Sequence, residues 1–234
     1  MSGRALLRQE SADWTNDKDV LQFGEWLRQG KLPEIKASVQ QRSVKTALAL
    51  IESGIRLLRL RSFDALSIEE VCAGASTTVG AFYGRFEDKT SFFVSMQRVA
   101  CLRSELALAE LIKTATAESA SLEFICHMVV RMSVQRYRSN VGIFRAALQR
   151  AHEGAWQLFK QLGDTYRASL TRLLSPHLDH LSSGARKMRI QFAYQAMVAT
   201  LVHASLNDPG PVHLNEDSMV NELTRLITSY LKSP

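Results

Sequence analysis

Cysteine is scarce in this sequence, and long apolar runs are missing. Three cysteines among 234 residues are too far apart, and odd in number, for a disulfide framework or a zinc cage. We therefore expect Cys72, Cys101 and Cys126 to be small buried hydrophobic residues in a reducing cytosol. No stretch approaches the roughly 20 apolar residues that a membrane span requires, and the first ten residues lack the apolar core of a signal peptide. These absences predict a cytoplasmic protein with no membrane partner.

Proline and strand patterns are equally sparse. Only five prolines occur, and no segment shows the alternating β-branched residues, bounded by turns, that mark a strand. Helical periodicity fills most of the rest, which predicts an all-α fold. The clearest break is an Asn-Asp-Pro-Gly-Pro loop late in the chain. The expected longer helices span residues 38–60, 88–113, 118–137, 140–151, 154–175, 183–206 and 216–232.

The usual marks of catalysis are missing as well. The sequence has no evident Ser-His-Asp or Cys-His arrangement, no phosphate loop and no dinucleotide fingerprint, so we expect neither an enzyme nor a cofactor. His177 and His180 have a spacing that could bind a metal. They follow a proline at a helix end, with no further histidine or cysteine nearby, which favours a polar surface turn over a metal site.

Positive charge is present in excess. With 46% hydrophobic and 22% charged residues the chain is an ordinary globular protein, and its net charge is +6. Residues 28–61 hold eight basic residues against two acidic ones, so this segment alone carries an excess of +6. Such a cluster is usually a solvated face, but beside a DNA-reading unit it would serve the phosphates.

Residues 56–89 contain two helix starts and a tight turn in close succession. Ser67 and Glu70 form the pattern of a capping box, in which the hydroxyl accepts from the Glu70 amide and the carboxylate reaches back to the Ser67 amide. A Gly-Ala-Ser turn follows, and Thr77 or Thr78 can cap the next helix.

That next helix is nearly bare on its outer face. Gly80 and Ala81 would let its backbone approach another molecule closely, while Phe82 and Phe86 point into the core. Two glycines within a helix of about eight residues each cost about 1 kcal/mol relative to alanine. This cost argues against the alternative of three short helices in a bundle, and it favours a helix-turn-helix that enters the major groove of DNA.

Three segments make the pattern specific: SFDALSIEEVC at 62–72, ASTTVGAFY at 75–83 and FEDK at 86–89. Over about residues 40–95 the sequence resembles the N-terminal DNA-binding domain of the TetR family of bacterial transcriptional regulators.

The sequence also departs from the family pattern. Ser76 stands in the turn where the family has glycine, so we expect it to adopt a positive φ. Val79 replaces a frequent lysine and Ala47 a frequent arginine, for which Arg42 and Lys45 can substitute about one turn upstream. These departures leave the architecture intact and the operator sequence open.

The resemblance implies a role for each matching residue. Thr78, Tyr83 and Lys89 would bind phosphates, and residues 79–81 would face the bases, where methyl groups suit thymine. Arg85 would reach a phosphate rather than a guanine. The alternatives are a half-buried aromatic for Tyr83 and a solvated charge for Arg85. The DNA-binding candidates are Arg42, Lys45, Thr77, Thr78, Val79, Gly80, Ala81, Tyr83, Arg85 and Lys89.

The N-terminal residues form a polar leader. Within it, Asn16 can cap a short helix that stops at Gly30. Trp14 and Trp26 indicate that the leader docks on something, although a partly ordered tail is an equal alternative. The expected parts of the chain are an N-terminal extension (1–38), a helix-turn-helix domain (39–98) and a larger regulatory domain (99–234).

The last two helices carry mixed apolar faces. The resemblance implies that they pair with those of a second subunit, giving a homodimer whose two recognition helices reach successive major grooves. The alternative is that they only close the core of one subunit.

The resemblance also implies a ligand cavity within residues 100–180. An apolar set with a few polar groups indicates a small apolar or aromatic effector, although each residue alone is more often plain core. The candidate lining residues are Phe124, His127, Met128, Met132, Phe144, Trp156, Phe159 and Tyr166.

These features predict a homodimeric repressor that binds a double-stranded DNA operator and leaves it when the effector binds. One alternative is an effector-independent DNA-binding protein of the same fold, acting as an activator or chromosome-associated factor. A second is an all-α enzyme or partner-binding module in which residues 56–89 are merely structural.

Overall fold

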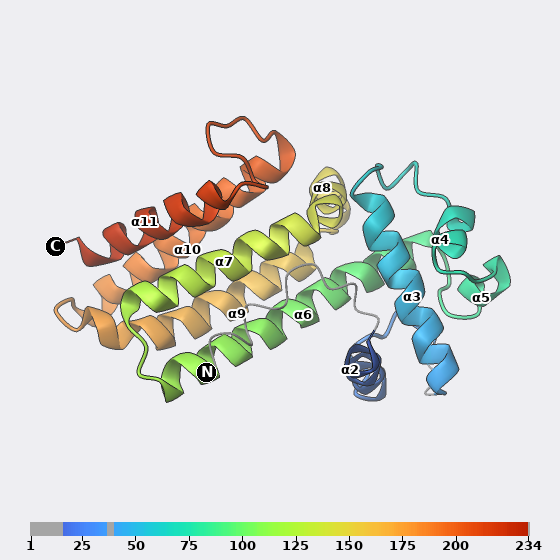
Figure 1. The fold of residues 1–234 in the computed structure, drawn as a ribbon, viewed down its shortest axis with the longest axis horizontal. Coiled ribbons are helices and arrows are strands. Elements are labelled where there is room, and N and C mark those ends of the chain that lie inside the picture. The colour runs from blue at the N-terminus through green and yellow to red at the C-terminus, as the bar shows by residue number, and fades with distance from the viewer. Residues whose placement is uncertain (1–15, 37–39, 234) are drawn as a thin grey trace. The chain divides into compact units, whose positions relative to one another are not determined.

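A computed structural model describes residues 16–36 and 40–233. All regular elements in these residues are helical, which confirms the all-α expectation (Figure 1). None of these helices combines the length and hydropathy of a transmembrane span. The elements are α2 (Asp17–Arg28), α3 (Gln41–Leu58), α4 (Ile68–Gly74), α5 (Val79–Tyr83), α6 (Lys89–Ala117), α7 (Leu122–Ser139), α8 (Val141–Gln149), η1 (Ala151–Glu153), α9 (Gln157–Leu174), η2 (Ser175–Leu178), α10 (Ser183–Leu206) and α11 (Asp217–Lys232).

The expected helices are present, with boundaries that differ by a few residues. α6 continues to Ala117 because the stretch after Lys113 is rich in alanine and threonine and contains no glycine or proline. It ends before Ser119, whose φ is 47°. α9 begins only at Gln157 because Gly154 adopts a φ of +85°, which a helix does not tolerate.

The N-terminal extension contains a docked helix. Asn16 caps α2 as expected, since its side-chain oxygen accepts from the Asp19 amide at 3.0 Å. Trp26 and Phe23 are buried, with exposed fractions of 2% and 0%, and α2 packs against α3. This helix is therefore docked and is not part of a loosely ordered tail. Trp14 lies outside the described residues.

The chain forms two compact units. The first holds the described residues up to Ala100 together with 140–147, and the second holds 101–139 and the described residues from 148 onward. The start of α8 belongs to the first unit because Gly142 lies directly against the end of α3: a Cβ at this position would be 1.9 Å from the Leu58 carbonyl oxygen. Only glycine permits this approach.

The core of the first unit is built from α3 and a group of aromatic rings. α3 buries one apolar stripe, from Val44 to Leu58. Phe82 and Phe86 are fully buried, as expected, and their rings pack on Phe92 with centroids 5.1 and 4.8 Å away. This aromatic group holds α5 against the N-terminal part of α6.

In the second unit α7, α9, α10 and α11 run side by side (Figure 1). Their shared core combines aliphatic side chains with buried rings; Val134, Leu201, Leu231 and Tyr166 are completely buried. Burial of each such aliphatic side chain contributes about 1.5–3 kcal/mol to stability. Cys101 and Cys126 are buried free thiols here, and Cys72 is one in the first unit, as expected.

Candidate functional site

The helix-turn-helix begins with a cap that is only half of the expected capping box. The Ser67 hydroxyl accepts from the Glu70 amide at 3.1 Å, which confirms the first half. The second half is wrong, because the Glu70 carboxylate pairs with Arg61 at 2.5 Å instead of returning to the Ser67 amide. A guanidinium is the stronger donor, since its hydrogen bond to a carboxylate is charge-assisted. The Ser67 hydroxyl in turn donates to Glu69 at 3.0 Å.

The turn between α4 and α5 depends on Ser76. Its φ is 50°, which confirms that a residue other than glycine adopts the positive φ at this position. The Thr77 amide donates to the Cys72 carbonyl at 2.9 Å and closes the turn. Thr78, rather than Thr77, then caps α5, because its hydroxyl accepts from the Ala81 amide at 3.2 Å.

The outer face of α5 is formed by small side chains and one tyrosine. Val79 is 36% exposed and Tyr83 47% exposed, while Thr78 and Gly80 are also exposed and Ala81 is half-buried. A Cβ at Gly80 would meet only the Thr78 hydroxyl oxygen, at an ordinary 3.9 Å. Packing among the described residues therefore does not require glycine at this position.

Arg85 and Lys89 both bind the protein's own backbone. The Arg85 guanidinium donates to the Ser43 and Ala81 carbonyls at 3.2 and 2.7 Å, and burial lowers the pKa of Arg85. The Lys89 ammonium donates to the Asp64 carbonyl at 3.1 Å, and it lies 4.8 Å from the centre of the Phe63 ring. Arg85 is thus not the solvated charge considered from the sequence, and both cations help to hold α5 and its flanking turns.

The remaining cationic candidates lie at the start of α3. Arg42 and Lys45 are exposed. Lys45 is 3.4 Å from the Asp17 carboxylate, a surface pair that contributes little energy and leaves the lysine accessible. Thr77 is half-buried in the turn.

Lys36 is a functional candidate that the sequence did not single out. It counted only as one charge of the basic segment, yet its ammonium donates to the Tyr83 carbonyl at 3.0 Å and its amide to the Arg85 carbonyl at 2.8 Å. No local pattern signals this contact, because 47 positions separate Lys36 from Tyr83.

The eight residues expected to line a ligand cavity are dispersed. Phe144 lies in the first unit and the other seven in the second. Phe144, Phe159 and Tyr166 are buried, and the other five are half-buried. Trp156 and Phe159 are in ring contact at 5.1 Å, and the Tyr166 hydroxyl donates to the Ser104 carbonyl at 3.1 Å.

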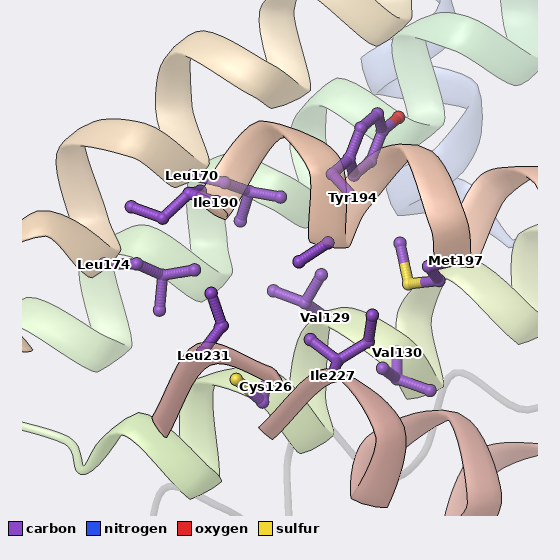
Figure 2. A pocket seen from close by; sticks show the side chains of 11 residues that line it. Cys126, Val129, Val130, Leu170, Leu174, Ile190, Tyr194, Met197, Ile227 and Leu231 are labelled. Atoms are coloured by element: carbon purple, nitrogen blue, oxygen red, sulfur yellow. The ribbon is translucent and has the colours of Figure 1, made fainter. Parts of the chain in front are cut away.

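An apolar cavity in the second unit is lined by none of these eight residues. Its side chains come from α7, α9, α10 and α11 and point toward one another (Figure 2). Its free volume of about 20 Å³ is roughly the space that one water molecule needs. The lining residues are Cys126, Val129 and Val130 from α7, Leu170 and Leu174 from α9, Ile190, Ala193, Tyr194 and Met197 from α10, and Ile227 and Leu231 from α11.

A cluster of tyrosines around Arg136 adjoins this cavity through Tyr194. The Arg136 guanidinium lies 5.2 and 5.0 Å from the ring centres of Tyr137 and Tyr166, and the Tyr166 ring stacks on Tyr194 at 5.8 Å. Burial raises the pKa of Tyr166 to about 12. Sequence periodicity predicts that Arg136 lies on a helix. It does not predict that these rings surround Arg136, because Tyr137, Tyr166 and Tyr194 come from three helices.

The last two helices expose large apolar side chains. Met188 and Phe192 on α10 are 69% and 49% exposed, and Leu226 on α11 is 53% exposed. The Phe192 ring lies 5.6 Å from that of Tyr230 on α11, so the two helices share this face. Other apolar residues of the same helices, among them Leu223, are buried within the unit.

Within the described residues there is no group of three or more histidine, cysteine or carboxylate side chains that could hold a metal. His177 lies in η2, half-exposed, and His180 is exposed in the turn that follows.

Comparison with known proteins gives two family matches. A family described as "Bacterial regulatory proteins, tetR family" matches residues 50–96, and one described as "Tetracyclin repressor-like, C-terminal domain" matches residues 121–231. Among solved structures, the chain is similar to the TetR family repressor AlkX from Dietzia sp. strain DQ12-45-1b, implicated in biodegradation of n-alkanes. The identity is 16%, the match covers 80% of this chain and 95% of that one, and the TM-score is 0.44. No curated protein matches the sequence.

Proposed function

Since the chain belongs to the TetR family of bacterial transcriptional regulators, we propose that it is a homodimeric, sequence-specific repressor that a small apolar or aromatic effector releases from its operator. The observation that carries this proposal is the exposed face of α5. This helix presents a bare backbone at Gly80 between the exposed Thr78 and Tyr83 side chains, although packing among residues 16–36 and 40–233 does not require glycine there.

We assign base contacts to Val79, Gly80 and Ala81. Methyl groups suit thymine methyls in the major groove, and a bare backbone permits close approach. The Thr78 hydroxyl accepts from the Ala81 amide and keeps its own proton, so it and the exposed Tyr83 hydroxyl would donate to phosphates and set the register of the helix on the duplex.

Cations around this helix supply the charge for phosphate binding. The exposed Arg42 and Lys45 lie at the start of α3. Lys89 retains donors beyond the one that binds the Asp64 carbonyl, since an ammonium has three. Arg85 and Thr77 would contribute indirectly, by holding α5 in position. In domain terms, we assign DNA binding to residues 39–98 and regulation to residues 99–234.

The homodimer would form through α10 and α11. Met188, Phe192 and Leu226 place large apolar side chains on the surface of these two helices, which is costly in a monomer unless a partner covers them. A two-fold axis there would present two α5 helices to half-sites about 34–36 Å apart, one turn of DNA.

The effector would act in the second unit. Pockets for small molecules usually measure about 300–1,000 Å³, far more than the present cavity, so an effector must separate the helices that line it. It would then favour an expanded state to the extent that it binds that state better. The expected residues of this unit remain candidate contacts, namely Phe124, His127, Met128, Met132, Trp156, Phe159 and Tyr166, whereas Phe144 belongs to the first unit. The small size of the cavity supports the alternative of an effector-independent regulator of the same fold equally well.

Two experiments test these proposals. Full-length protein is titrated onto the duplex upstream of its own coding sequence at several salt concentrations, with poly(dI-dC) as the non-specific comparison. Selective, salt-dependent binding by the dimer is expected, and a folded dimer that binds no DNA at low salt refutes the regulator. A thermal-shift panel of alkanes and aromatic compounds then seeks ligands that raise stability and release the DNA. DNA binding without any such ligand supports the effector-independent alternative.

A further inference from the structure

The recognition helix α5 is too short to hold its own shape. It has five residues, and isolated helices shorter than about 12–15 residues are marginal in water. Its N-terminal end is capped by Thr78 and its buried side is anchored by Phe82. What holds its C-terminal end therefore decides how α5 is presented to DNA.

Two cationic side chains bind that end. Arg85 donates to the Ala81 carbonyl at 2.7 Å and to Ser43 of α3 at 3.2 Å, and Lys36 donates to the Tyr83 carbonyl at 3.0 Å. Carbonyls in the last turn of a helix have no intrahelical partner, and they form the negative end of its dipole. A lysine and an arginine suit both needs.

The segment that carries Lys36 is itself fixed. Leu32 and Ile35 are buried, and the Glu34 carboxylate receives a bidentate pair from Arg98 of α6, with distances of 2.6 and 3.0 Å. The Lys36 amide adds a bond of 2.8 Å to the Arg85 carbonyl. The segment is thus a strap held on both sides, not a free arm.

We propose that Lys36 is a positioning residue for DNA recognition: the strap of residues 29–36 clamps the C-terminal end of α5 in the geometry that fits the major groove. This inference rests on the proposed function. It gives the N-terminal extension a role that does not require any contact with DNA. Without the clamp, α5 occupies the binding geometry for only part of the time, and apparent affinity falls by that fraction.

Three variants test the clamp. Lys36→Met removes the charge and the hydrogen bond, Lys31→Met removes an exposed charge from the same strap, and Lys36→Arg keeps a cationic donor. Each is titrated onto a duplex selected by the wild-type protein from a random pool, and onto poly(dI-dC). Hydrogen exchange by mass spectrometry is measured across residues 79–86 in the free proteins.

Lys36→Met is expected to bind the selected duplex about tenfold more weakly, the cost of losing one hydrogen bond from a charged donor. On poly(dI-dC) it should lose no more than Lys31→Met, and Lys36→Arg should recover most of the selective affinity. Exchange at 79–86 should accelerate in Lys36→Met alone.

Equal losses for Lys36→Met and Lys31→Met on both DNAs, with unchanged exchange, would show that Lys36 is merely one more charge and would overturn the proposal. Thermal unfolding verifies folding, and Lys36→Gln replaces Lys36→Met if the methionine variant does not fold. If wild-type protein selects no duplex, the proposed function fails, while the exchange measurement still decides whether the clamp exists.

Discussion

Alanine at Gly80 is expected to stabilise the protein and weaken its binding to DNA. Inside the chain the substitution is harmless, because the added Cβ meets only the Thr78 hydroxyl oxygen at 3.9 Å. The helix gains about 0.5–1 kcal/mol, since alanine loses less backbone entropy on folding than glycine does. For a chain of this size, this corresponds to a rise in Tm of about 1–4 °C.

On DNA the same methyl group has no room if α5 lies against the bases at Gly80. Forcing one extra carbon into a close-packed contact costs about 1–3 kcal/mol, so affinity for the operator should fall about 5-fold to 150-fold. The salt dependence should stay the same, because the substitution removes no cation. Fluorescence anisotropy with a labelled operator measures the affinity, and differential scanning calorimetry measures the Tm.

Gly184→Ala is the matched control. Gly184 lies in the first turn of α10, a Cβ there has no neighbour within 4 Å, and the position is remote from α5 in the sequence. This variant should be slightly stabilised with unchanged DNA affinity. Two results would refute the reasoning for Gly80: full DNA affinity in the alanine variant, which removes the close approach, or a lower Tm, which shows that the chain itself needs the glycine.

Three further predictions concern assembly, pH and packing. Phe192→Glu should turn the dimer into a monomer and weaken operator binding, as measured by light scattering and anisotropy; a variant that stays dimeric at micromolar concentration would locate the interface elsewhere. Burial raises the pKa of the Cys126 thiol from 9.0 to about 11. The unfolded thiol then ionises first, so between pH 9 and 11 the free energy of unfolding should fall by about 2–3 kcal/mol. Urea titrations of Cys126→Ala should lack this component, and an identical pH profile would contradict it. Gly142→Ala should lose about 1–3 kcal/mol or more, because its Cβ would lie 1.9 Å from the Leu58 carbonyl oxygen; a stability equal to that of Gly184→Ala would show that α8 does not pack there.

In the helix-turn-helix, some local features could be predicted from the sequence and one could not. The caps by Ser67 and Thr78 and the positive φ of Ser76 were predictable. The caps depend on the residue types within one turn of chain, whereas the φ of Ser76 was expected from the glycine that the TetR family has at that position. The reach-back of Glu70 failed although its spacing was right, because Arg61, from a different segment, offered the carboxylate a stronger donor.

The residues expected to line a ligand cavity likewise depend on contacts that local sequence patterns do not reveal. Their apolar character predicted burial or half-burial, and they have it. Hydrophobicity does not say which buried side chains face the same space, since that depends on how each helix is rotated against its neighbours. The cavity is accordingly lined by other residues of α7 and α9, among them Val129, and by residues of α10 and α11, among them Ile190 and Leu231.

The sequence by itself determined the all-α class, the helix-turn-helix and the bare face of α5, because these follow from periodicity and from contacts between residues three or four positions apart. Only the tertiary structure decided what supports that face. The Arg85–Ser43, Lys36–Tyr83 and Arg98–Glu34 contacts span 42, 47 and 64 positions. Such contacts depend on how helices pack in space, and nothing in the local order of residues encodes them.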